Sequence, residues 1–159
     1  MKFNSIMHVS FYTDNMERTR DFYENKLGLT TKMIVKFSVY KDQPDSVFYQ
    51  MAQTNPDDIC IIYFEIAPGQ FIECFPKMPN QKPRDKEWNS RLGYSHCALL
   101  VDDIHETREE LASLGIEIDV EPNIGSSKTW KMWIHDPDGN KFEIMQYTED
   151  SVQIKENSN

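Results

Sequence analysis

Residues 8–16 of the chain have the sequence HVSFYTDNM, and residues 96–104 have the sequence HCALLVDDI. Each segment starts at a histidine, continues as an apolar-rich run of the strand type, and ends at a pair of Asp or Asn side chains. When the histidines are aligned, Asn15 matches Asp103. This internal repeat predicts that the chain consists of two related halves.

A helix is expected directly after each of these segments, because an Asp is followed three residues later by a Glu. The two pairs are Asp14 with Glu17 and Asp103 with Glu106. Apolar residues then recur every three or four positions, which is typical of a helix that packs one face on a core. Gly28 and Gly115 follow these stripes, where a left-handed C-cap is expected.

The ends of the two halves also match, since Gly69 precedes Glu73 by four residues and Gly139 precedes Glu143 by four. Both patterns predict a turn followed by a strand. Further extended segments are expected at 33–40, 46–52, 59–67, 117–121 and 129–135. The predicted fold class is therefore α+β, built from two βαβββ half-repeats.

The predicted organisation is one globular domain made of both halves. The first half covers residues 1–75 and the second covers 94–147. Residues 76–93, with three prolines and five basic side chains, are expected to form an exposed connector. Residues 148–159 are polar, and we expect a flexible tail there.

Composition limits the classes of partner. The formal net charge of −9 argues against nucleic acid or an anionic membrane, because both require a positive protein surface. No apolar run approaches the roughly 18 to 20 residues that cross a bilayer, and the first residues resemble a strand and not a secretion signal. Three cysteines at unpaired spacings predict reduced thiols. We expect a cytoplasmic protein that binds a small molecule.

Four side chains occupy matched positions in the repeat, namely His8 and His96 at the first strands and Glu73 and Glu143 at the last. A strand histidine or glutamate is by itself more often structural or solvent-facing than a ligand. Equivalent positions in a duplicated unit, however, can face each other across a pseudo-twofold axis. Two imidazoles and two carboxylates suit one divalent ion such as Zn²⁺, Ni²⁺, Co²⁺, Fe²⁺ or Mn²⁺. The sequence thus predicts a metal site.

From about residue 5 to residue 147 the chain resembles the vicinal oxygen chelate superfamily, and glyoxalase I in particular. The resemblance is carried by IMHVSFYTDNMERTRDFYENKLGL, GQFIECF, GYSHCALLVDDI and DPDGNKFEIMQ. In that family, paired βαββ units form curled mixed sheets around a metal cavity. All four positions match its His/Glu/His/Glu ligand set.

The resemblance implies a lyase or isomerase that converts the hemithioacetal of methylglyoxal and a thiol into a hydroxyacyl thioester. The metal would polarise the vicinal oxygens and stabilise the enediolate, while a glutamate moves the proton between adjacent carbons. We expect Glu143 to be the base and Glu73 its possible partner. We also expect a homodimer, in which the two halves pair within one chain or exchange between chains, in which case each pocket would draw ligands from both subunits.

The substrate is the least determined part. Candidates for binding the carboxylates of a thiol such as glutathione are Arg18, Arg20, Arg91, Lys128 and Lys131. Trp130, Trp133 and Tyr49 could line the cavity. Alternatives within the superfamily are an epimerase, a thiol transferase acting on an antibiotic, and a ring-cleaving dioxygenase. A non-catalytic drug-binding protein of the bleomycin-resistance type is a fourth possibility.

Overall fold

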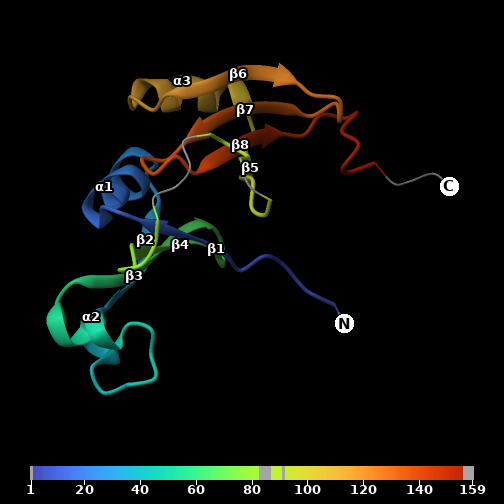
Figure 1. Ribbon diagram of the computed structural model, residues 1–159. Coiled ribbons are helices and arrows are strands. Elements are labelled where there is room, and N and C mark those ends of the chain that lie inside the picture. Colours follow the sequence, from blue (N-terminus) through green and yellow to red (C-terminus); the bar gives the residue numbers. More distant parts are fainter. Residues whose placement is uncertain (1, 83–86, 91, 156–159) are drawn as a thin grey trace. The chain divides into compact units, whose positions relative to one another are not determined.

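A computed structural model describes residues 2–82, 87–90 and 92–155, and it divides into two compact units, Met1–Lys82 and Pro83–Asn159. The boundary falls inside the expected connector. Each unit contains one four-stranded mixed sheet and its own helices (Figure 1). Among the described residues no helix has the length and apolar character needed to cross a membrane.

The first unit has the strand order β1-β4-β3-β2, with β1 parallel to β4 and the other pairs antiparallel. Its elements in chain order are β1 (His8–Thr13), α1 (Met16–Arg20), the π-helix η1 (Asp21–Lys26), β2 (Thr30–Lys36), the 3₁₀ helix η2 (Phe37–Tyr40), α2 (Tyr49–Thr54), β3 (Ile59–Ala67) and β4 (Gln70–Pro76).

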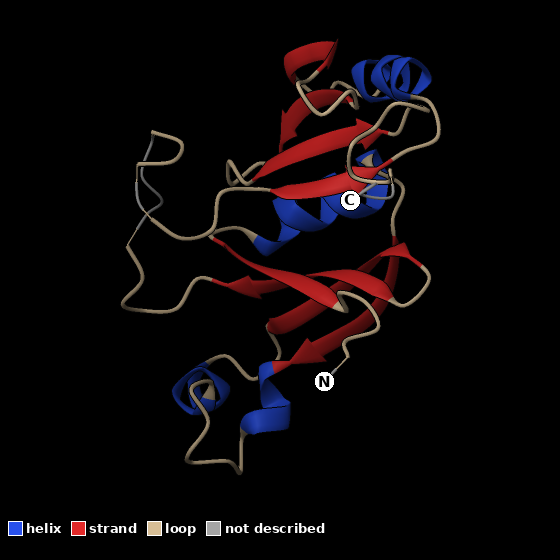
Figure 2. Ribbon diagram, turned by 90° about the vertical axis from the view of Figure 1, so that its right-hand side faces the viewer, coloured by secondary structure: helices blue, strands red, loops and turns tan. Residues whose placement is uncertain are grey.

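The second unit repeats this arrangement with the order β5-β8-β7-β6, and β5 is parallel to β8. Its elements are β5 (Cys97–Leu100), α3 (Ile104–Ser113), β6 (Ile118–Ile124), β7 (Trp130–His135) and β8 (Lys141–Gln146). The predicted α+β class with two βαβββ halves is confirmed. The strands are drawn in red in Figure 2.

One face of each sheet is covered by the helix that follows its first strand. In the first unit Tyr23 of η1 stacks on Phe64 of β3 with ring centroids 5.1 Å apart, and both side chains are fully buried. In the second unit Ile104 of α3 is buried together with Met132 and Phe142. Burial of such side chains stabilises each by about 1.5 to 3 kcal/mol. The predicted ligands lie on the opposite face of each sheet, and in the first unit this face also receives Phe48, which stacks on Phe75 of β4.

The N-caps of α1 and α3 follow the sequence signals, except that the cap of α1 is one residue later than predicted. The N-cap of α3 is Asp103, as predicted, and its carboxylate accepts hydrogen bonds from the backbone of His105 and Glu106. The N-cap of α1 is Asn15, because its side chain accepts from the backbone N–H of Arg18 while Asp14 pairs with the guanidinium of Arg18. An Asx side chain therefore caps both α1 and α3, at aligned positions of the repeat.

Two expected strands differ in the first unit. The prediction of an extended segment at 46–52 is wrong, because α2 begins at Tyr49, and the strand expected at 33–40 ends at Lys36. Short apolar runs fit a buried helix as well as a strand. Phe37 and Ala52 are buried here against Cys60.

Figures 1 and 2 show α1 and α2 on opposite sides of the first sheet.

The segment after β8 packs back on its own unit as far as the structure describes it. The hydroxyl of Thr129 hydrogen-bonds to Oε1 of Gln153 at 2.7 Å, and Val152 donates its backbone N–H to Ser127 at 2.9 Å. Ser151 is buried. These contacts differ from the flexible tail that polar composition indicates, and residues 156–159 lie outside the described part of the chain.

Candidate metal centre

His8 and Glu73 lie side by side on the open face of the first sheet. Their strands β1 and β4 are parallel neighbours, with Ser10 directly opposite Glu73 and His8 one side-chain period earlier. The Nε2 atom of His8 is 3.4 Å from Oε2 of Glu73. The glutamate is only 6% exposed, whereas the imidazole is more than one third exposed.

His96 and Glu143 form the equivalent pair in the second unit. His96 directly precedes β5, and Glu143 on the parallel strand β8 lies opposite Ala98. Nε2 of His96 is again 3.4 Å from Oε2 of Glu143. The repeat seen in the sequence is thus also a repeat of local geometry, because both halves place the same two donor atoms at the same separation.

This separation fits two ligands of one ion. Donor atoms held about 2.1 Å from a metal in octahedral or tetrahedral geometry lie about 3.0 to 3.4 Å apart. A direct N–H···O hydrogen bond is usually shorter, at about 2.7 to 3.2 Å. Imidazole nitrogen and carboxylate oxygen are also donors that first-row divalent ions accept. Each pair therefore has the spacing and chemistry of half of a metal site.

The four predicted ligands are brought together two by two, one pair in each unit. Among the residues that the structure describes, no group of three or more His, Cys, Asp or Glu side chains is arranged to hold a metal ion. A complete His/Glu/His/Glu site needs contributions from both units, so it stays a prediction.

Hydroxyl groups surround Glu73. Ser10 Oγ donates to Oε2 of Glu73 at 2.5 Å. Burial first, and then the interaction with the Glu73 carboxylate, raise the pKa of Tyr63 to about 12. The pKa of Tyr40 is raised by burial and then by electrostatic interaction with Cys60 and Glu73. The Glu73 carboxylate is therefore surrounded by the hydroxyl groups of Ser10, Tyr63 and Tyr40.

Glu143 has a different, more apolar neighbourhood. Its cross-strand partner on β7 is Trp133, whose ring contacts His96 edge-on with centroids 4.7 Å apart. Trp88, from the expected connector, adds a second indole, with its ring centroid 5.0 Å from that of Trp133. The indole N–H of Trp88 donates to the backbone carbonyl of Ser95. The Ser95 hydroxyl lies 3.0 Å from Nδ1 of His96. This contact can fix the orientation of the imidazole so that Nε2 faces Glu143.

Sequence patterns alone did not single out Ser10, Tyr63 or Trp88. Ser10 had a usable signal, because it lies two residues after His8 and so shares its strand face. Tyr63 had none, since its place opposite Glu73 depends on the register of β3 with β4. Trp88 lies in the expected connector and is exposed there, and no sequence signal indicates its contact with Trp133.

The structure gives little support for the residues that were predicted to bind the substrate. Arg18 pairs with Asp14 at 2.6 Å and Arg20 with Glu24 at 2.8 Å, both along the helix surface. Arg91 lies outside the described residues. Trp133, by contrast, is on the open face beside Glu143.

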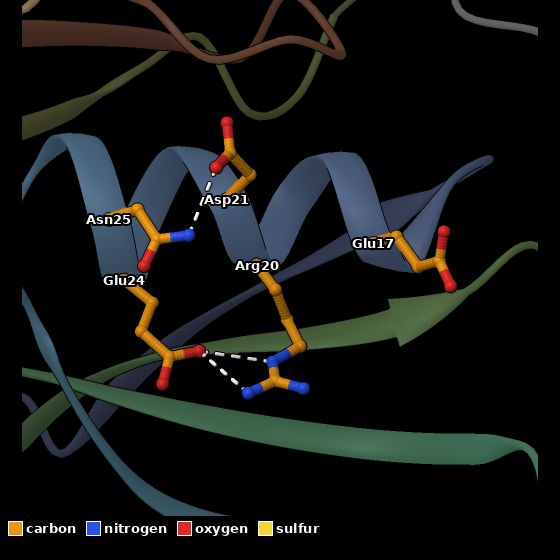
Figure 3. A pocket seen from close by; sticks show the side chains of 5 residues that line it. All are labelled: Glu17, Arg20, Asp21, Glu24 and Asn25. Carbon is orange, nitrogen blue, oxygen red and sulfur yellow. Dashed lines mark hydrogen bonds and ion pairs between the residues drawn. The ribbon is translucent and has the colours of Figure 1, made fainter.

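A surface depression on α1 and η1 offers no comparable chemistry. Figure 3 shows its lining, which consists of Glu17, Arg20, Asp21, Glu24 and Asn25 from one helical stretch. Arg20 is paired with Glu24, and Asn25 donates to Asp21. These contacts are ordinary one-turn pairs on a solvated helix face.

Comparison with known proteins gives a consistent result. The family model for the Glyoxalase/Bleomycin resistance protein/Dioxygenase superfamily matches residues 5–144. A probable chloroplastic lactoylglutathione lyase of Arabidopsis thaliana is 25% identical over 89% of this chain, which spans 35% of that protein. The lactoylglutathione lyase of Neisseria meningitidis serogroup A is also 25% identical, with 89% of both proteins covered.

Solved structures show the same fold. The glyoxalase family protein from Enterococcus faecalis aligns over 91% of this chain and 99% of its own, with a TM-score of 0.68 and 24% identity. Lactoylglutathione lyase from Agrobacterium tumefaciens aligns over 92% and 96%, with a TM-score of 0.60 and 18% identity. At these identities the structural likeness concerns the fold alone.

Proposed function

The chain belongs to the Glyoxalase/Bleomycin resistance protein/Dioxygenase superfamily, and we propose that within it the protein is a metal-dependent lyase or isomerase of the glyoxalase I type. The observation that carries this proposal is the pair of matched His–Glu arrangements, each with a 3.4 Å separation between Nε2 and Oε2. A protein that only binds a drug has no need for two such pairs.

The proposed metal ligands are His8, Glu73, His96 and Glu143, acting together on one divalent ion. Two carboxylates offset the charge of the ion, and two imidazoles suit Zn²⁺, Ni²⁺, Co²⁺, Fe²⁺ or Mn²⁺. When bound, the ion would supply Lewis-acid polarisation of two adjacent substrate oxygens. We further propose a homodimer, with each site formed within one chain or shared between subunits; one site per chain results either way.

The proposed substrate is the hemithioacetal of methylglyoxal, or of a related small 2-oxoaldehyde, with a thiol. Glu143 would take the proton from the carbon that carries the hydroxyl and the sulfur, and deliver it to the neighbouring carbonyl carbon. The hydroxyl proton moves to the second oxygen, so the product thioester is an isomer of the substrate. Glu73 would be the second carboxylate of the site. Such proton transfer contributes about 10²- to 10⁴-fold to the rate.

The test combines metal analysis with an isomerase assay. Purified protein, loaded in turn with Zn²⁺, Ni²⁺ and Co²⁺, is supplied with methylglyoxal and either glutathione or cysteine, and thioester formation is followed by its absorbance. We expect turnover with at least one metal and thiol, and a loss of about a hundredfold or more in Glu143→Gln. Glu117→Gln is the matched control, because Glu117 is exposed on the loop before β6.

Two results would contradict the proposal in different ways. Protein that takes up no divalent ion would refute the metal site. Protein that binds metal tightly, but converts neither hemithioacetal, would refute the isomerase assignment and direct attention to a different substrate on the same fold.

A further inference from the structure

The two carboxylates of the proposed site are equivalent by repeat but unequal in their surroundings. Opposite Glu73 on the neighbouring strands lie Ser10 and Tyr63, whereas opposite Glu143 lie Ala98 and Trp133. The register is the same in both units, so the difference comes from side-chain identity alone. The first unit has a hydroxyl group on each side of its glutamate, and the second unit has neither.

The two hydroxyls have a direct physical effect on Glu73. The Ser10 bond, at 2.5 Å, has the short length typical of O–H donation to an ionised carboxylate, which is roughly twice as strong as a neutral hydrogen bond. The phenol of Tyr63, directly opposite Glu73 on β3, interacts with the same carboxylate strongly enough to raise the pKa of Tyr63. Because Glu73 is only 6% exposed, water does not readily replace the Ser10 donor. Moving this carboxylate would break the Ser10 bond and separate the carboxylate from Tyr63.

Tyr63 and Trp133 differ in only one respect that concerns the carboxylates. Both rings pack edge-on against the histidine of their own unit, with centroids 5.7 Å apart for Tyr63 and His8 and 4.7 Å apart for Trp133 and His96. The aromatic support is therefore repeated, and the hydroxyl is the addition. The two residues directly opposite Glu143, Ala98 and Trp133, carry no hydroxyl group.

We propose that Ser10 and Tyr63 are positioning residues that hold Glu73 in place as the fixed carboxylate ligand of the site. This inference rests on the proposed function, since it concerns the same metal. Its consequence is a division of labour: the first half anchors the ion through a carboxylate that does not move, and the second half keeps a carboxylate that nothing similar restrains.

Binding of Co²⁺ to metal-free protein tests the proposal without relying on turnover. Removal of a group that orients a ligand typically weakens metal affinity about 10- to 100-fold. We expect a loss of this size for Ser10→Ala and a larger one for Ser10→Ala combined with Tyr63→Phe. Ser10→Thr keeps the hydroxyl and should restore the affinity, which separates the effect from a general loss of packing.

The reciprocal variant, Ala98→Ser, places a hydroxyl opposite Glu143 at the position equivalent to Ser10. It should leave Co²⁺ affinity equal to or above that of the wild type and lower kcat about tenfold or more, because the carboxylate becomes restrained. A kcat equal to that of the wild type would contradict the division of labour. Thermal melting of each variant establishes that it is folded.

Failure of the positioning role can be distinguished from failure of the proposed isomerase function. If the wild type binds Co²⁺ and the double variant binds it within threefold of the same affinity, the positioning role is refuted while the isomerase can stand. If the wild type binds Co²⁺ but converts no hemithioacetal, the isomerase is refuted, and the affinities still decide the role of Ser10 and Tyr63. If the wild type binds no Co²⁺, Zn²⁺ or Ni²⁺, both proposals fail.

Discussion

Two glycines set where the glutamates of the candidate site fall in their sheets. Gly69 and Gly139 have φ angles of +73° and +79°, a left-handed conformation that side chains with a Cβ rarely adopt. Each forms the turn that leads into the last strand of its unit. The register that follows places Glu73 opposite Tyr63 and Glu143 opposite Trp133.

Alanine at either glycine should destabilise the protein. A Cβ in the left-handed region costs roughly 1 to 2 kcal/mol, and space is available at both sites, so strain and not collision is the cause. We expect Gly69→Ala and Gly139→Ala to lower the free energy of unfolding, measured with urea, by about that amount. Gly125→Ala is the control, because Gly125 has no positive φ and its new Cβ would meet only a lysine side chain. Equal losses at all three positions would contradict this account.

Single residues also show how far the sequence determines the site. Repeat position predicts His8 and Glu73, and the structure places their donor atoms together. Period-two alternation puts Ser10 on the same face, so its role could be inferred once Glu73 was located. Tyr63 could not be placed, because the register of β3 on β4 includes an irregularity near the turn between Glu65 and Ala67.

At the level of elements, the helices that follow β1 and β5 were more predictable than the segment between β2 and β3. The caps and the terminal glycines are local signals, and Gly28 and Gly115 do adopt positive φ as expected. The segment between β2 and β3 is determined by tertiary packing, since Phe48 stacks near Phe75 of β4 and α2 buries Ala52. Local pattern cannot supply that information.

The cap of α3 makes a prediction about pH. The backbone N–H of Glu106 lowers the pKa of Asp103 below its ordinary value of 3.8, and the N–H of His105 acts in the same direction. A carboxyl group with a lowered folded pKa stabilises the protein above its unfolded pKa, and this contribution is lost as pH falls through the folded pKa. The stabilisation by charge should therefore be fully present at pH 7 and begin to be lost once the pH falls below about 4.

Asp103→Asn isolates this contribution, because asparagine is an equally good N-cap but carries no charge. We expect the wild type to have the higher urea midpoint at pH 7, and the difference between the two proteins to shrink as the pH is lowered below about 4. A difference that is independent of pH would mean that the charge of Asp103 does not contribute.

At the level of the whole chain, the division into two units determines what each half can do alone. The boundary at Lys82 and Pro83 lies within the predicted connector, which the run of prolines and basic residues made visible in the sequence. How the two units associate was not encoded in any local pattern, because it depends on surfaces of both. Each unit has one histidine and one glutamate at ligand spacing, and two ligands are too few for a tight site.

Metal stoichiometry decides whether the pairs act jointly. If one ion takes its ligands from both units, the wild type binds one ion per chain, and removal of either pair abolishes tight binding. The variants are His8→Ala with Glu73→Gln, and His96→Ala with Glu143→Gln, measured by titration of metal-free protein with Zn²⁺. If each pair instead held its own ion, the wild type would bind two and each variant would keep one. We expect the first result, because such ions are held by three or four protein ligands as a rule. A variant that has lost one His–Glu pair keeps only two. The count is the same whether the units that share an ion belong to one chain or to two chains of a dimer, so the outcome tests the joint site itself.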